Sequence, residues 1–86
     1  MRIKNEIEYV IRILLYLTKY GENRIVSSNE ISDAEDIPHL FSLRILKKLE
    51  KAGLVKIFKG ARGGYQLTKP SEEITLRDAV ETIEPV

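Results

Sequence analysis

Apolar residues recur at the spacing of an α-helix over residues 7–20. One face of this predicted helix carries Ile7, Val10, Ile11, Leu14 and Leu17, and a second apolar face carries Tyr9, Ile13, Tyr16 and Tyr20. A helix that is apolar on two sides needs two surfaces to pack against. We expect the first face to enter the core. The second face, Tyr9 to Tyr20, contacts either another copy of the chain, as a dimer interface, or the chain's own last helix.

Cap and break signals predict three more helices. Ser27 and Glu30 have the spacing of a capping box, which predicts a short helix from about residue 28. Pro38 suits the first turn of a third helix over residues 38–52, which Gly53 would end. Thr75, with Asp78 three residues later, predicts the start of a last helix.

Residues 54–58 and 65–67 are rich in β-branched and aromatic side chains and flank a glycine-rich turn, which predicts a hairpin. The order is therefore helix, helix-turn-helix, hairpin, helix. This order predicts a mainly α (α+β) fold, a winged helix-turn-helix with a two-stranded β wing. The length of 86 residues suits a single domain over residues 1–86.

The predicted third helix has one apolar and one cationic side. Its core side is expected to be Phe41, Ile45, Leu46, Leu49 and Ala52. Within about one third of the helical wheel lie the cations Arg44, Lys47, Lys48 and Lys51. A cationic helix that follows a short helix and a tight turn is typical of a recognition helix in the DNA major groove. The lysines would meet phosphates, and the N-terminal residues would meet base edges.

The candidate base-contacting residues are His39, Leu40, Leu43 and Arg44. Arginine binds guanine through two hydrogen bonds, and leucine can touch the thymine methyl group. The two leucines have an alternative role in core packing. Ser28, at the start of the short helix, is a further candidate DNA contact.

Charge is strongly segregated although the net charge is only +1. Residues 44–69 hold eight lysines or arginines and one glutamate, whereas residues 21–43 and 70–86 are each net acidic. A concentrated cationic region suits a polyanion, and a solvated basic face without a partner is the alternative.

The hairpin turn belongs to the same cationic region. Its predicted DNA-binding residues are Lys59, Gly60, Arg62, Gly63 and Gly64, a wing over residues 59–64. Glycines permit a thin tip, and a long cation on such a tip can enter a narrow minor groove. An ordinary solvated turn is the alternative, which the neighbouring cationic helix disfavours.

Several kinds of site are excluded or unsupported. The chain has no cysteine, which excludes disulfides, thiolate metal sites and thiol catalysis, and His39 is its only histidine. We find no catalytic constellation and expect no enzyme activity, metal or cofactor. Arg12 interrupts the apolar run from Tyr9, which is also shorter than the ~20 residues of a membrane span, so we expect a cytoplasmic protein.

Five segments together resemble a known family: EYVIRILLYL, VSSNEIS, IPHLFSLRILKKLEKAGLV, KGARGGYQLTKP and ITLRDAVETIE. They are similar to the IscR/CymR/NsrR family of bacterial winged-helix transcription regulators. The resemblance implies a homodimer that binds a palindromic operator, usually as a repressor. The third helix would lie in the major groove and the wing in the minor groove, with Arg2 and Lys4 as the basic N-terminus near phosphate.

Three features depart from the family pattern. Ser42 stands where leucine is usual, and Ala61 stands where proline is common. The three cysteines that sensing relatives carry after the last predicted helix are absent, since the chain ends at Val86. The chain is then either the DNA-binding portion of a longer regulator or a short natural version.

The sequence therefore predicts a sequence-specific, double-stranded DNA-binding transcription regulator. A winged-helix module that binds protein partners rather than DNA is the alternative.

Overall fold

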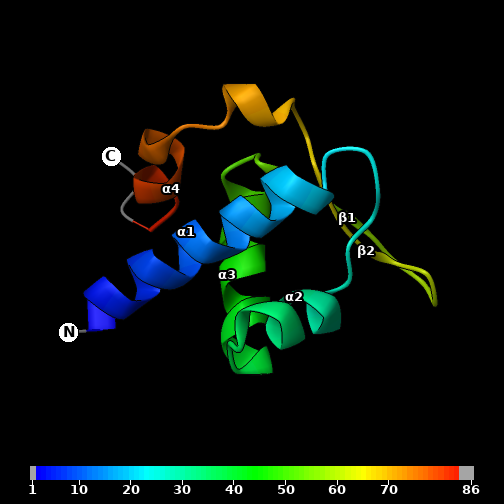
Figure 1. The fold of residues 1–86 in the computed structure, drawn as a ribbon, viewed down its shortest axis with the longest axis horizontal. Helices are drawn as coiled ribbons and strands as arrows, with labels where there is room; N and C mark the ends of the chain where they lie inside the picture. Colours follow the sequence, from blue (N-terminus) through cyan, green and yellow to red (C-terminus); the bar gives the residue numbers. More distant parts are fainter. Residues whose placement is uncertain (1, 84–86) are drawn as a thin grey trace.

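The computed structural model describes residues 2–83 of the chain, with side chains from residue 6 onward. Its elements are α1 (Arg2–Tyr20), α2 (Ser28–Glu35), α3 (His39–Lys51), β1 (Val55–Phe58), β2 (Gly64–Leu67), the 3-10 helix η1 (Ser71–Glu73) and α4 (Leu76–Ile83). Figure 1 shows α1 crossing α3, with α2 below them, α4 at one end of the molecule and the hairpin extending from the other. The predicted winged helix-turn-helix with a two-stranded wing is confirmed.

The hydrophobic core lies where α1, α2, α3 and the base of the wing meet. Its fully buried side chains include Val10, Ile13, Leu17, Val26, Ile31, Ile45, Leu46 and Leu49. Ile13 has no exposed surface, so it packs in this chain's own core and does not belong to a surface face with Tyr9, Tyr16 and Tyr20. The helix also begins five residues earlier than the predicted start at Ile7.

The helix-turn-helix is fixed by local caps. The Ser27 side chain accepts the backbone N–H of Glu30 at 3.0 Å, as predicted for the start of α2. Asp36 ends α2 in the left-handed conformation, at a φ of 54°. Pro38 precedes α3 rather than entering its first turn, because its carbonyl accepts the first N–H groups of the helix, from Phe41 and Ser42. Gly53, at a φ of 82°, follows the end of α3 as expected.

The buried side of α3 differs from the predicted one. Ile45, Leu46 and Leu49 are buried as expected, but the fourth buried residue is Ser42, whereas Phe41 is 43% exposed and Ala52 is exposed. The helix is rotated toward Ser42 because this small side chain faces α2, where the Ser32 hydroxyl donates to its oxygen at 2.8 Å. A buried hydroxyl is stable only when it is hydrogen-bonded, and this pair satisfies both groups.

The wing is an antiparallel pair in which Val55 faces Leu67 and Phe58 faces Gly64. A third segment fixes its position: Val26 and Tyr65 exchange two backbone hydrogen bonds of 2.8 Å each. Because Val26 lies just before α2, this bridge joins the wing directly to the start of the helix-turn-helix.

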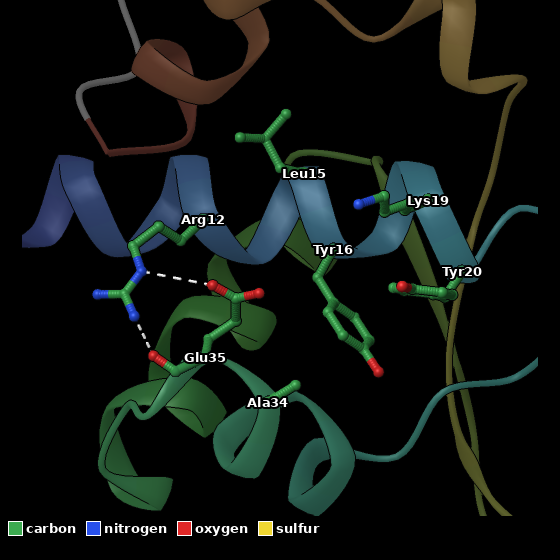
Figure 2. A pocket seen from close by; sticks show the side chains of 7 residues that line it. All are labelled: Arg12, Leu15, Tyr16, Lys19, Tyr20, Ala34 and Glu35. Atoms are coloured by element: carbon green, nitrogen blue, oxygen red, sulfur yellow. Dashed lines mark hydrogen bonds and ion pairs between the residues drawn. The ribbon is translucent and has the colours of Figure 1, made fainter.

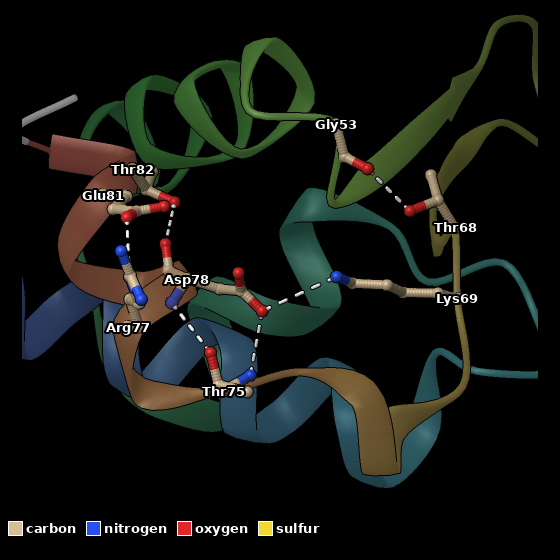
Figure 3. Close-up of polar contacts among 8 residues, drawn as sticks. All are labelled: Gly53, Thr68, Lys69, Thr75, Arg77, Asp78, Glu81 and Thr82. Atoms are coloured by element: carbon tan, nitrogen blue, oxygen red, sulfur yellow. Dashed lines mark hydrogen bonds and ion pairs between the residues drawn. The ribbon is translucent and has the colours of Figure 1, made fainter. Parts of the chain in front are cut away.

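The chain after the wing returns to α1 through η1 and α4 (Figure 3). The predicted capping box is present, since Asp78 N–H donates to Thr75 Oγ1 at 3.1 Å and Thr75 N–H donates to Asp78 Oδ2 at 2.9 Å. These contacts, the Thr75 backbone bond above all, lower the pKa of Asp78, and Lys69 lies 3.7 Å from the same carboxylate. Leu76 and Val80 of α4 stay exposed, at 69% and 42%. Within residues 2–83, no helix is long and apolar enough to cross a bilayer.

Candidate nucleic-acid interface

The outer side of α3 presents most of the predicted contact residues. His39, Leu40, Arg44, Lys47 and Lys51 are all exposed. Leu40 is 81% exposed, so it has no packing role within the described chain, whereas Leu43 is only 37% exposed. An exposed leucine beside exposed cations suits a surface that meets both bases and phosphates.

Lys48 differs from its cationic neighbours. Its ammonium lies 2.5 Å from the Glu6 carboxylate of α1, and both side chains are largely covered. This lysine therefore joins α3 to α1 rather than standing free on the cationic side.

The start of α3 is joined to the start of α2. Ser28 Oγ lies 2.9 Å from His39 Nε2, within hydrogen-bond distance. Ser28 also lines a cleft of about 350 Å³, whose other wall is the wing, including Lys59, Gly60 and Gly64. The first turn of α3, the start of α2 and the wing thus form one continuous surface, in which Ser28 lies between His39 and the cleft that Lys59 borders.

The wing turn is narrow because two of its glycines allow backbone carbonyl groups to approach where a side chain would not fit. Gly60 has a φ of 107° and accepts the N–H of Gly63 at 3.0 Å. A Cβ at Gly63 would overlap the Phe58 carbonyl oxygen, and one at Gly64 would lie 2.5 Å from the Val26 carbonyl oxygen. Lys59 and Arg62 are exposed on this turn.

An acidic residue in the first turn of α2 links this helix to α1. Glu30 accepts two hydrogen bonds from the Arg24 guanidinium, at 2.6 and 3.1 Å, and one from the Tyr16 hydroxyl at 2.5 Å. The Arg24 hydrogen bonds, followed by that of Tyr16, hold the pKa of Glu30 below its usual value. The same contact with Glu30 raises the pKa of Tyr16. The cluster therefore joins the first turn of α2 to α1 and to the loop between them.

Other residues predicted to take part in binding or in the dimer lie away from this surface or outside the described side chains. The side chains of Arg2 and Lys4 lie outside the described residues. Tyr9 and Tyr16 are half-buried, and Tyr20 is 45% exposed. Figure 2 shows Tyr16 and Tyr20 lining a hollow between α1 and α2, across which Arg12 reaches Glu35. Among the α1 side chains from residue 6 onward, the most exposed apolar one is Leu15, at 61%. Leu15 also borders a small apolar groove toward Leu76 of α4.

Comparison with known proteins adds a family to this geometry. A family model described as "Rrf2: Iron-dependent Transcriptional regulator" matches residues 3–86. The chain belongs to the Rrf2 family of transcriptional regulators. This is a family of non-enzymatic, DNA-binding winged-helix proteins.

Individual relatives agree with this assignment. Protein aau3 of Rhizobium meliloti (strain 1021) is 38% identical over 84 residues, which are 98% of this chain and 54% of aau3. The structure of CymR (YrzC), the global cysteine regulator of B. subtilis, has a TM-score of 0.85 at 27% identity, over 94% of this chain and 63% of CymR. IscR of T. potens has a TM-score of 0.82 at 26% identity, over 90% of this chain and 56% of IscR. The chain spans about half to two thirds of the length of these relatives.

The described residues do not fit an iron site. The sequence supplies no cysteine and a single histidine. Between residues 2 and 83, no three histidine, aspartate or glutamate side chains are grouped so that they could hold a metal ion. The residues that the structure describes therefore offer no set of ligands for iron.

Sequence reasoning missed three features in and around α3: the Glu6–Lys48 pair, the buried Ser32–Ser42 pair and the exposed position of Phe41. The departure of Ser42 from the family pattern was the one available signal, since a serine among apolar core positions calls for a polar partner.

Proposed function

We propose that this chain binds double-stranded DNA at specific sequences, with α3 in the major groove and the wing over residues 59–64 in the minor groove. The observation that supports this most is the continuous surface from His39 through Ser28 to Lys59. A recognition helix and a wing can act on one duplex only if they flank a common surface of this kind.

Within α3, the residues divide by the groups they would meet. Arg44, in the second turn, is suited to two hydrogen bonds with guanine, and Leu40 to contact with a thymine methyl. Lys47 and Lys51, further along the exposed side, are suited to phosphates. Lys48 is proposed as a secondary contact because Glu6 already holds its ammonium.

The start of α2 and the wing are suited to contact the sugar-phosphate backbone of DNA between the major and the minor groove. Ser27 and Ser28, at the start of α2, line the cleft that Lys59 and Gly60 border. Arg62, exposed at the narrow turn, is suited to a minor groove of high negative potential. The basic N-terminus, Arg2 and Lys4, would add phosphate contacts.

The same proposal includes a homodimer on a palindromic operator, acting as a repressor. Two copies would give two half-sites spaced by the dimer's geometry. Tyr20, with Tyr16 against it and Tyr9 further along α1, remains the proposed dimer face. Sedimentation analysis of the chain at high concentration tests this part, and a monomer would overturn it.

Selection of binding sites from random duplex DNA, at two salt concentrations, tests the function directly. We expect one enriched sequence, bound more weakly at the higher salt concentration. Absence of enrichment at both concentrations would overturn sequence-specific binding.

A protein-interaction module is the second candidate, favoured by the exposed Leu15 and Leu76 beside one apolar groove. Partner binding that is insensitive to salt, together with no retention of duplex DNA, would support it instead.

A further inference from the structure

Four side chains from two helices form a continuous stack that ends at Arg44. The Arg12 guanidinium carbon lies 5.9 Å from the centre of the Tyr9 ring, and the Tyr9 ring centre lies 5.7 Å from that of Phe41. The Arg44 guanidinium carbon then lies 6.0 Å from the Phe41 ring centre. The two rings are inclined at 58°, within the range of favourable aromatic pairs.

The far end of this stack is anchored. Arg12 donates to the backbone carbonyl of Glu35 and lies 3.4 Å from the Glu35 carboxylate, as Figure 2 shows. Glu35 is the last residue of α2, so Arg12 joins α1 to the first helix of the helix-turn-helix. Tyr9 is half-buried beside it.

The stack explains why Phe41 stands at the surface. Phenylalanine is usually buried and serine is usually exposed. On α3 the reverse holds, because Phe41 is 43% exposed while Ser42 takes the core position. Its ring packs against that of Tyr9 and also lies near the Arg44 guanidinium. Among the described side chains, Arg44 takes part in no ion pair, so the ring is its identified partner.

We propose that Phe41 is a positioning residue for base recognition: its ring, held by Tyr9, restricts the Arg44 side chain to conformations that project from α3. An arginine loses much rotamer freedom when it binds a base through two hydrogen bonds, so a side chain restricted beforehand loses less on binding. This inference rests on the proposed function, in which Arg44 contacts a base.

The test uses the 86-residue chain and a duplex site selected with it. The variants are Phe41→Leu, Phe41→Tyr, Arg44→Ala and the double change Phe41→Leu with Arg44→Ala. For each, the dissociation constant is measured on the selected site and on sites changed at one base pair at a time. A thermal unfolding curve of each variant confirms that it is folded.

Arg44→Ala should lose discrimination only at the base pair that Arg44 contacts. That position is therefore the one where a base-pair change alters the dissociation constant of Arg44→Ala least. At that position Phe41→Leu should reduce discrimination by roughly two- to five-fold, the size of an exposed cation–π contact. Phe41→Tyr should retain discrimination. In the Arg44→Ala background, Phe41→Leu should cause no further loss at that position.

Two results would overturn the inference while leaving the proposed function intact. Phe41→Leu could weaken binding to all sites equally, or it could have the same effect with and without Arg44. If instead Arg44→Ala leaves discrimination unchanged at every position, the proposed role of Arg44 fails, and that of Phe41 fails with it.

Discussion

Lys48 of α3 and Glu6 of α1 form an ion pair of 2.5 Å, which links one cation of α3 to another helix of the same chain. The neighbouring Lys47 is exposed and takes part in no ion pair among the described side chains. Two adjacent lysines on one helix thus have different roles: Lys47 is available to phosphate, whereas Lys48 must first separate from Glu6.

We therefore expect Lys47→Ala to weaken DNA binding more than Lys48→Ala. Loss of one phosphate contact makes the slope of log affinity against log salt concentration less steep by about 0.9. We expect this change for Lys47→Ala and less than half of it for Lys48→Ala. Glu6→Gln should raise affinity, because it frees Lys48. Fluorescence anisotropy of a labelled duplex across salt concentrations measures all three. Equal slopes for the two lysine variants would show that the ion pair does not persist on DNA.

The wing is expected to favour A·T-rich sequence beside the major-groove site. Narrow A·T-rich minor grooves attract arginine, so replacement of the flanking A·T pairs by G·C should weaken wild-type binding. Arg62→Ala should bind both duplexes weakly and nearly equally. Arg77→Ala is the matched control, since Arg77 is also exposed but lies on α4, at the end of Figure 1 away from the wing. An unchanged A·T preference in Arg62→Ala would contradict the role of the wing.

The buried serine pair should couple α2 to α3. Ser42→Ala leaves the Ser32 hydroxyl buried without its partner, which costs about 1–3 kcal/mol of unfolding free energy. For a domain of this size, each kcal/mol lowers the unfolding midpoint by roughly 4–8 °C. The double change of both serines to alanine should recover part of the loss, because no unpaired hydroxyl remains. A double variant less stable than Ser42→Ala would contradict this account. Thermal unfolding followed by circular dichroism measures each variant.

The Glu30 cluster should make stability depend on pH. Hydrogen bonds from Arg24 and Tyr16 favour the charged carboxylate, so the pKa of Glu30 is lower in the folded than in the unfolded chain. Its contribution is therefore complete above the unfolded pKa and is lost as the pH falls through the lower folded value. Glu30→Gln should lower the unfolding midpoint at pH 7, and this difference should shrink below about pH 4.

The control for that change is Glu72→Gln, which also removes one negative charge but from an exposed site in η1. A midpoint difference for Glu30→Gln that is constant from pH 7 to pH 3 would show that the carboxylate's charge does not contribute.

The order of the elements could be predicted because several boundaries have a local cause, although the start of α1 and the position of Pro38 differed from the prediction. Ser27, Gly53 and the Thr75–Asp78 pair act within one turn of their own helix, so their spacing in the sequence was sufficient. The cationic side of α3 followed in the same way from helical periodicity.

Features that depend on contacts between helices could not be predicted. Periodicity placed Phe41 in the core and allowed Ile13 at the surface, because it cannot tell which way a helix is rotated against its neighbours. The Ser32–Ser42 hydrogen bond and the Tyr9 ring determine that rotation for α3. The Glu6–Lys48 pair, 42 residues apart, left no local signal either.

The most direct test of the central claim, that α3 and the wing meet one duplex, is the salt dependence of duplex binding by wild type, Lys47→Ala, Arg62→Ala and their double variant. The account predicts that wild-type affinity falls steeply with salt concentration. The log–log slope should be less steep by about 0.9 in each single variant and by about 1.8 in the double variant. A double variant that binds the duplex with the wild-type affinity and slope would contradict it.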